Sequence, residues 1–125
     1  MSDSTTTVLL VDDSRTSLSV LVAYLDKTGY ELVRARDGME ALRLLTLEPA
    51  RYHAVLLDLE MPRMSGLEVL RRMKTHAELT HVPVIIQTAS SDPHQVAEGL
   101  AAGARYYLIK PFQQDKLQEI GRAHV

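Results

Sequence analysis

The stretch His53-Ala-Val-Leu-Leu-Asp58 decides the fold, because it is an apolar run that stops on an aspartate; Leu59-Glu-Met-Pro-Arg-Met-Ser-Gly66 follows it. Such a run is typical of a buried strand. Pro62 and Gly66 indicate a turn before the next helix. We therefore expect Asp58 where a sheet opens to solvent. Its position fits a nucleophile or an ion ligand, but taken alone it fits better the turn or cap residue that a lone aspartate commonly is.

The composition indicates a single domain. The chain has 125 residues, a formal net charge of −2 and no cysteine, which excludes disulfides and thiolate metal sites. The slight acidity argues against general binding to nucleic acids or membrane surfaces. No signal peptide and no apolar run near the ~20 residues of a membrane span is visible. We expect a soluble, cytoplasmic domain over residues 1–125, with residues 1–6 as a disordered leader.

Apolar runs and helical periodicities alternate along the chain. Strands are expected at 8–11, 30–35, 55–58, 82–88 and 105–110, and helices at 15–28, 39–48, 65–74, 91–103 and from 112 onward. Continuous apolar strands that alternate with helices are typical of a parallel sheet covered on both faces. The expected fold class is α/β: a doubly wound five-stranded parallel sheet in the order 2-1-3-4-5, as in flavodoxin-like three-layer sandwiches.

Four of the expected strands end on residues that can carry chemistry: Asp12 and Asp13, Asp58, Thr88, and Lys110. Ligands of such folds bind outside the carboxyl ends of the strands, so we expect these five side chains in one pocket. Each also has an ordinary explanation, as a solvated turn, a helix cap or the end of an edge strand. Their coincidence at one edge of the sheet favours a site.

The chemistry of this set points to phosphoryl transfer. Three neighbouring carboxylates repel one another unless positive charge is supplied, either by Lys110 or by a hard cation. A site of oxygen ligands without Cys or His favours Mg²⁺. A carboxylate, Mg²⁺, a hydroxyl and a lysine together suit phosphoryl transfer, which depends on positioning and charge neutralisation. Asp58 is then the phosphate acceptor.

The same residues carry a family resemblance that covers Val8 to about Ile120. The chain resembles the receiver domains of two-component response regulators and is similar to the chemotaxis receiver. The motifs that carry the resemblance are Asp12-Asp13, Asp58-x-x-Met61-Pro62, Gly66, Thr88-Ala89 and Lys110-Pro111-Phe112. The resemblance implies a phosphoacceptor switch that phosphorylates and dephosphorylates itself rather than turning over a substrate.

Residue roles follow from the resemblance alone. Asp58 would accept phosphate from the phosphohistidine of a sensor histidine kinase or phosphotransfer protein, which would dock near Arg15, Ser17 and Ser19. Asp13 and Asp58 would ligate Mg²⁺ directly, with the backbone carbonyl of Glu60 as a third ligand and Asp12 acting through water. Lys110 would contact the acid or the phosphoryl group, and its bond to Pro111 is often cis in such domains. Thr88 and Tyr107 would be the switch residues.

Phosphate on Asp58 would draw Thr88 inward and change the surface of the fourth helix, fifth strand and fifth helix. That surface is a candidate for homodimerisation. Glu60 and Ser90 lie two residues beyond Asp58 and Thr88, so we expect both at the rim of the pocket, with Glu60 acting on the attacking water. An effector domain beyond Val125 or a separate effector protein would receive the signal.

Three other functions can be compared with this pattern of residues. An aspartate-nucleophile phosphatase usually carries an Asp-x-Asp pair after its first strand, whereas here Asp12 and Asp13 are adjacent. An FMN-binding flavodoxin needs a phosphate loop at that place, where two acids would repel phosphate. A receiver-like scaffold that never takes phosphate is disfavoured because the residues of the site are all present.

Overall fold

Five strands and five α-helices alternate in the computed structural model, which describes residues 6–89 and 92–124. The elements are β1 Thr7–Val11, α1 Arg15–Leu25, β2 Glu31–Ala35, α2 Gly38–Leu47, β3 Ala54–Asp58, α3 Gly66–Lys74, β4 Val84–Thr88, α4 Pro93–Ala101, β5 Tyr106–Ile109 and α5 Gln114–His124, with short 3-10 helices at Asp26–Thr28, Pro49–Arg51 and Ala77–Leu79.

The strands form one parallel sheet in the order β2-β1-β3-β4-β5, which confirms the predicted fold class. All residues of β1, β3 and β4 are buried, whereas β2 and β5 are partly exposed. This difference follows from position, because only the edge strands have a free side. The three central strands therefore bring their last residues to one protected edge of the sheet.

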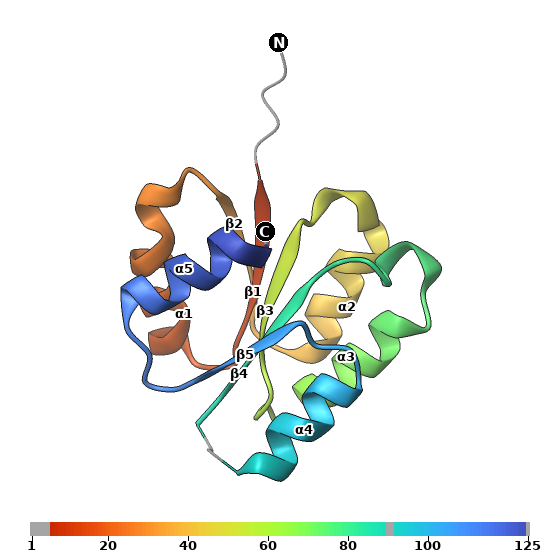
Figure 1. Cartoon of the computed structure of the whole chain (residues 1–125). Coiled ribbons are helices and arrows are strands. Elements are labelled where there is room, and N and C mark those ends of the chain that lie inside the picture. Colours follow the sequence, from red (N-terminus) through yellow and green to blue (C-terminus); the bar gives the residue numbers. More distant parts are fainter. Residues whose placement is uncertain (1–5, 90–91, 125) are drawn as a thin grey trace.

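Helices cover both faces of the sheet, as Figure 1 shows: α1 and α5 lie on one side, and α2, α3 and α4 on the other. Alternate residues of β1 pack against the helices on the two faces of the sheet, because successive side chains of a strand point to opposite faces. Leu9 and Val11 join the core under α2 and α3, and Val8 and Leu10 join the core under α1 and α5. The sequence thus encodes a three-layer sandwich.

Polar side chains fix the starts of the helices. Ser14, Asp37, Ser65 and Asp92 each accept a hydrogen bond from a backbone N–H of the helix that follows. These caps satisfy donors that the first helical turn leaves unpaired. The first helix leaves α-geometry earlier than predicted, at Leu25, and the predicted remainder to residue 28 forms a 3-10 turn.

One core residue was not predicted, and two predicted features lie partly or wholly outside the described residues. The connection between α3 and β4 contributes a core residue, Leu79 of the 3-10 helix Ala77–Leu79, although the segment around it is polar. A single leucine in a polar segment gives no periodic signal, so only packing reveals it. Residues 1–5 of the predicted leader 1–6 lie outside the described residues, and so does the predicted rim residue Ser90. None of the described helices is long and apolar enough to cross a membrane.

Candidate phosphoacceptor site

The chain topology brings three carboxylates together at the carboxyl ends of β1 and β3. These two strands are neighbours, but the chain leaves β1 toward α1 and leaves β3 toward α3, which cover opposite faces. Ligands of doubly wound folds bind at such a switch point. Oxygen atoms of Asp12, Asp13 and Asp58 lie within 4.8 Å of one another. The predicted acidic cluster is therefore present in the structure.

The Asp58 side chain is held at the bottom of this cluster. Asp58 is 4% exposed, and its Oδ1 accepts a hydrogen bond from the backbone N–H of Glu60 at 3.1 Å. Gly66 lies against the backbone of Asp58 and Leu59 so closely that a Cβ at this position would overlap the Asp58 carbonyl oxygen. Glycine at 66 is thus required by the turn that presents Asp58.

Lys110 supplies the positive charge, and its closer contact is with Asp12 rather than with Asp58. Its Nζ donates to Asp12 Oδ2 at 2.8 Å and lies 3.8 Å from Asp58 Oδ1. Asp12 is fully buried, and its Oδ1 accepts from the backbone N–H of Ser14 at 3.0 Å. The Lys110–Pro111 peptide bond is cis. Lys110 therefore bridges the two buried carboxylates.

The electrostatics single out Asp58. The pKa of the Asp58 carboxyl is raised from 3.8 to about 7. Burial is the largest cause; Lys110 and the Glu60 N–H act in the opposite direction, and Asp12 and Asp13 add to the rise. Burial dominates because a carboxylate in a protein interior loses the solvation that stabilises its charge. A cation in the cluster would offset the same cost. The three oxygen donors are the type that Mg²⁺ prefers, so these residues fit that ion.

Thr88 lies at the end of β4, where its carbonyl oxygen accepts from the backbone N–H of Lys110 at 2.8 Å, and Tyr107 lies on β5. Thr88 is fully buried, and its hydroxyl donates to Oε1 of Gln95, on α4, at 3.3 Å. Tyr107 is half-buried on the face of the sheet that α2, α3 and α4 cover, and its ring stacks on Tyr106 with centroids 5.5 Å apart. Gln95 could not be predicted from the sequence, because its contact with Thr88 depends on where α4 lies over β4.

Glu60 connects two loops at the mouth of the site. Its side chain is exposed, and Oε1 accepts a hydrogen bond from the backbone N–H of Ala89 at 3.0 Å. The predicted rim position of Glu60 agrees with this geometry. The carboxylate is engaged in this contact because Ala89, which follows β4, approaches it from another part of the chain.

Sequence reasoning missed Gln87, which stands next to Asp58 in the sheet register. Gln87 is fully buried, and neither its Nε2 nor its Oε1 has a hydrogen-bond partner in the described part of the chain. A buried amide without partners destabilises a fold. The apolar run around it gave the only available signal: a lone amide among Val84, Ile85 and Ile86.

Comparisons with known proteins agree with this geometry. The response regulator receiver domain family matches residues 8–122. Response regulator MprA of Mycolicibacterium vanbaalenii is 39% identical over 110 residues; the match covers 88% of this chain and 46% of MprA. The chain therefore spans less than half the length of that curated relative.

Solved structures of about this length are also similar. Chemotaxis protein CheY4 of Vibrio cholerae has a TM-score of 0.89 at 30% identity, covering 98% of this chain and 100% of that one. The receiver domain of sensor histidine kinase PA1611 from Pseudomonas aeruginosa PAO1 has a TM-score of 0.86 at 31% identity, covering 97% and 98%, and its structure has a magnesium ion in the active site cleft. This chain belongs to the response regulator receiver domain family.

Proposed function

We propose that Asp58 accepts a phosphoryl group from the phosphohistidine of a sensor histidine kinase or phosphotransfer protein, in a cytoplasmic phosphorelay. The observation that carries this proposal is the clustering of Asp12, Asp13 and Asp58 around one lysine. A buried carboxylate whose charge is unfavourable in the free protein is poised to react when positive charge is added. Fold alone would not support this function; the side chains at the strand ends do.

The proposed reaction forms a bond between an Asp58 oxygen and phosphorus and breaks the bond from phosphorus to the donor imidazole nitrogen, which then takes up a proton. Oδ1 of Asp58 is occupied by the Glu60 N–H, while Oδ2 has no hydrogen bond in the described part of the chain. We therefore take Oδ2 as the nucleophile. Lys110, 3.8 Å from Oδ1, is placed to neutralise charge that develops on the phosphoryl oxygens.

Asp13, Asp58, Asp12 and the backbone carbonyl of Glu60 are the groups that would hold Mg²⁺. When bound, this ion would neutralise the carboxylates and the phosphoryl oxygens. Asp13 is exposed whereas Asp12 and Asp58 are buried, so the cluster is open to solvent on the Asp13 side. Incoming ion and phosphodonor would both enter from there.

The hydrogen bond between Thr88 and Gln95 supports a route for the signal. A phosphoryl group adds about −1.5 to −2 charge and three acceptor oxygens beside Thr88. If the Thr88 hydroxyl turns to donate to these oxygens, it releases Gln95 and so one tie between β4 and α4. Space beside Thr88 would then admit the half-buried Tyr107 ring, and the α4–β5–α5 surface would change.

The proposal also assigns a surface to each class of protein partner. A kinase or phosphotransfer protein would dock on the exposed side of α1 near Arg15, Ser17 and Ser19. The altered α4–β5–α5 surface would contact an effector domain, an effector protein or a second copy of the chain.

Phosphorylation is tested with acetyl phosphate and Mg²⁺, followed by intact mass measurement. We expect an adduct of one phosphoryl group that requires Mg²⁺ and is absent in Asp58→Asn. Asp26→Asn, which removes an exposed carboxylate outside the site, is the matched control and should still be modified. An adduct that persists in Asp58→Asn would contradict the proposed acceptor.

The relay is tested separately by amide NMR spectra with and without beryllofluoride. We expect shifts over α4 and β5 in the parent. These should be smaller in Thr88→Val, which keeps the shape of the side chain but removes the hydroxyl, although Asp58 still binds the mimic. Equal α4 shifts in Thr88→Val and the parent would reject the route through Thr88.

A further inference from the structure

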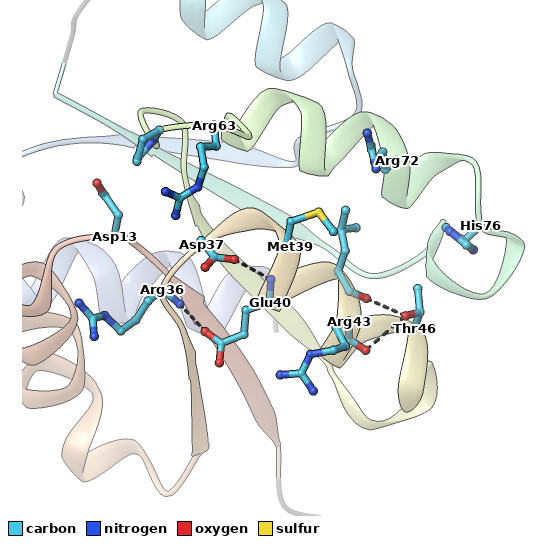
Figure 2. A pocket seen from close by; sticks show the side chains of 12 residues that line it. Asp13, Arg36, Asp37, Met39, Glu40, Arg43, Thr46, Arg63, Arg72 and His76 are labelled. Carbon is cyan, nitrogen blue, oxygen red and sulfur yellow. Dashed lines mark hydrogen bonds between the residues drawn. The ribbon is translucent and has the colours of Figure 1, made fainter.

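A second feature adjoins the phosphoacceptor site at Asp13: a groove of about 1120 Å³ between α2 and α3 (Figure 2). Its walls carry four arginines, Arg36, Arg43, Arg63 and Arg72, and we call it the arginine groove. Arg36 precedes α2 and Arg63 precedes α3, whereas Arg43 and Arg72 lie within these helices. Figure 2 shows Arg36 and Arg63 near the end where Asp13 lies, and Arg72 farther along.

Most of these guanidinium groups form no ion pair with the described residues. Arg72 pairs with Glu68 at 2.8 Å, but Arg36, Arg43 and Arg63 take part in no ion pair within residues 6–89 and 92–124. All four arginines are exposed. Three guanidinium groups without an ion pair to the described residues therefore line one groove.

The carboxylates that share the groove are engaged elsewhere. Asp37 Oδ1 accepts from the backbone N–H of Glu40 at 2.7 Å, and Glu40 Oε1 accepts from the backbone N–H of Arg36 at 2.9 Å. Both acids therefore stabilise the start of α2 rather than an arginine side chain. Asp13 belongs to the acidic cluster at β1. The side chains of Arg36, Arg43 and Arg63 therefore stay available for an external anion.

The size and length of the groove favour a polypeptide over a small anion. Its volume exceeds the roughly 300–1,000 Å³ of small-molecule pockets. The residues that line it run along α3, from Arg63, which precedes this helix, to His76, which follows it. A helix of nine residues spans about 13 Å, the reach of about four extended residues. Met39, which is 62% exposed, adds an apolar contact.

We propose that the arginine groove binds an acidic segment of a partner polypeptide. Guanidinium groups form two parallel hydrogen bonds with a carboxylate, so arginines spaced along a groove suit a chain with several Asp and Glu side chains. An apolar residue of the segment would contact Met39. Phosphate on Asp58 is not required for this binding, so the proposal can be tested without phosphorylation.

The probe is a fluorescein-labelled octapeptide of six glutamates and two leucines, with an octapeptide of six glutamines and two leucines as its uncharged match. Fluorescence anisotropy with the full chain should show binding of the acidic peptide that weakens as salt is raised. The variant R36Q/R43Q/R63Q should bind roughly tenfold more weakly, which is about twofold for each exposed ion pair. Amide NMR shifts should fall on α2 and α3.

The matched control removes three arginines elsewhere, R71Q/R105Q/R122Q, which are exposed and do not line the groove. This control changes the net charge equally and should keep the parent affinity. Equal weakening in both triple variants, or equal binding of the uncharged peptide, would overturn the proposal. So would tighter binding of a single-stranded oligonucleotide of equal charge, or full displacement by an equal concentration of tripolyphosphate. Circular dichroism verifies that both variants are folded.

Discussion

Replacing Asp58 by asparagine is expected to stabilise the free protein at neutral and alkaline pH. The folded chain holds a carboxylate whose pKa is raised from 3.8 to about 7, mainly by burial. At about 1.4 kcal/mol per pH unit, this difference corresponds to at most ~4 kcal/mol. The attraction to Lys110 is already contained in this pKa, and solvent at the mouth of the site screens the effect further, so we expect ~1–3 kcal/mol for Asp58→Asn.

The sign of the pH dependence follows from proton binding. Unfolded Asp58 loses its proton near pH 3.8 and folded Asp58 near pH 7, so between these values the folded state binds more protons. The free energy of unfolding of the parent therefore falls as pH rises across this window. The advantage of Asp58→Asn is absent below pH 3.8, grows through the window, and stays constant above about pH 7.

Urea denaturation in EDTA at about pH 4, 6 and 8 measures this effect. Added Mg²⁺ should then raise the stability of the parent more than that of Asp58→Asn, because binding to the folded state stabilises it. Asp26→Asn is the control and should follow the pH profile of the parent. A variant Asp58→Asn that is less stable than the parent at pH 8 in EDTA would refute the reasoning, because Asp58 would then stabilise the fold as a charged group.

Two further substitutions test the surroundings of the site. Gln87→Met removes the two unpaired amide atoms and should raise the free energy of unfolding by ~1 kcal/mol in urea denaturation; a loss of stability would show that the amide has a partner such as a buried water. Glu60→Ala removes the acceptor of the Ala89 N–H and should open the rim to water, so that dephosphorylation accelerates roughly two- to fivefold; Glu60→Gln keeps an acceptor and should retain the parent rate. Identical rates for all three proteins would contradict the role of Glu60.

Much of the fold could be predicted because its signals are local. Apolar runs such as Val8–Val11 and Val55–Leu57 alternate with helical periodicity, and the rules of parallel sheets leave few arrangements. The places of Asp12, Asp13, Asp58 and Lys110 follow from the same rules, since they stand where strands end. The ends of the helices and strands could be predicted only to within a few residues, because side-chain caps and prolines set where each element stops.

The sequence by itself determined which groups stand at the strand ends, and the tertiary structure decided which of them touch. Lys110 donates to Asp12, 98 residues away, rather than directly to Asp58. Thr88 donates to Gln95, and Glu60 accepts from Ala89. Local sequence patterns indicate which residues are buried and toward which face of the sheet they point. These contacts depend instead on strand register, on how each helix lies over the sheet, and on how two loops approach each other. The arginine groove has the same origin: four arginines scattered from residue 36 to residue 72 share one surface because α2 packs beside α3.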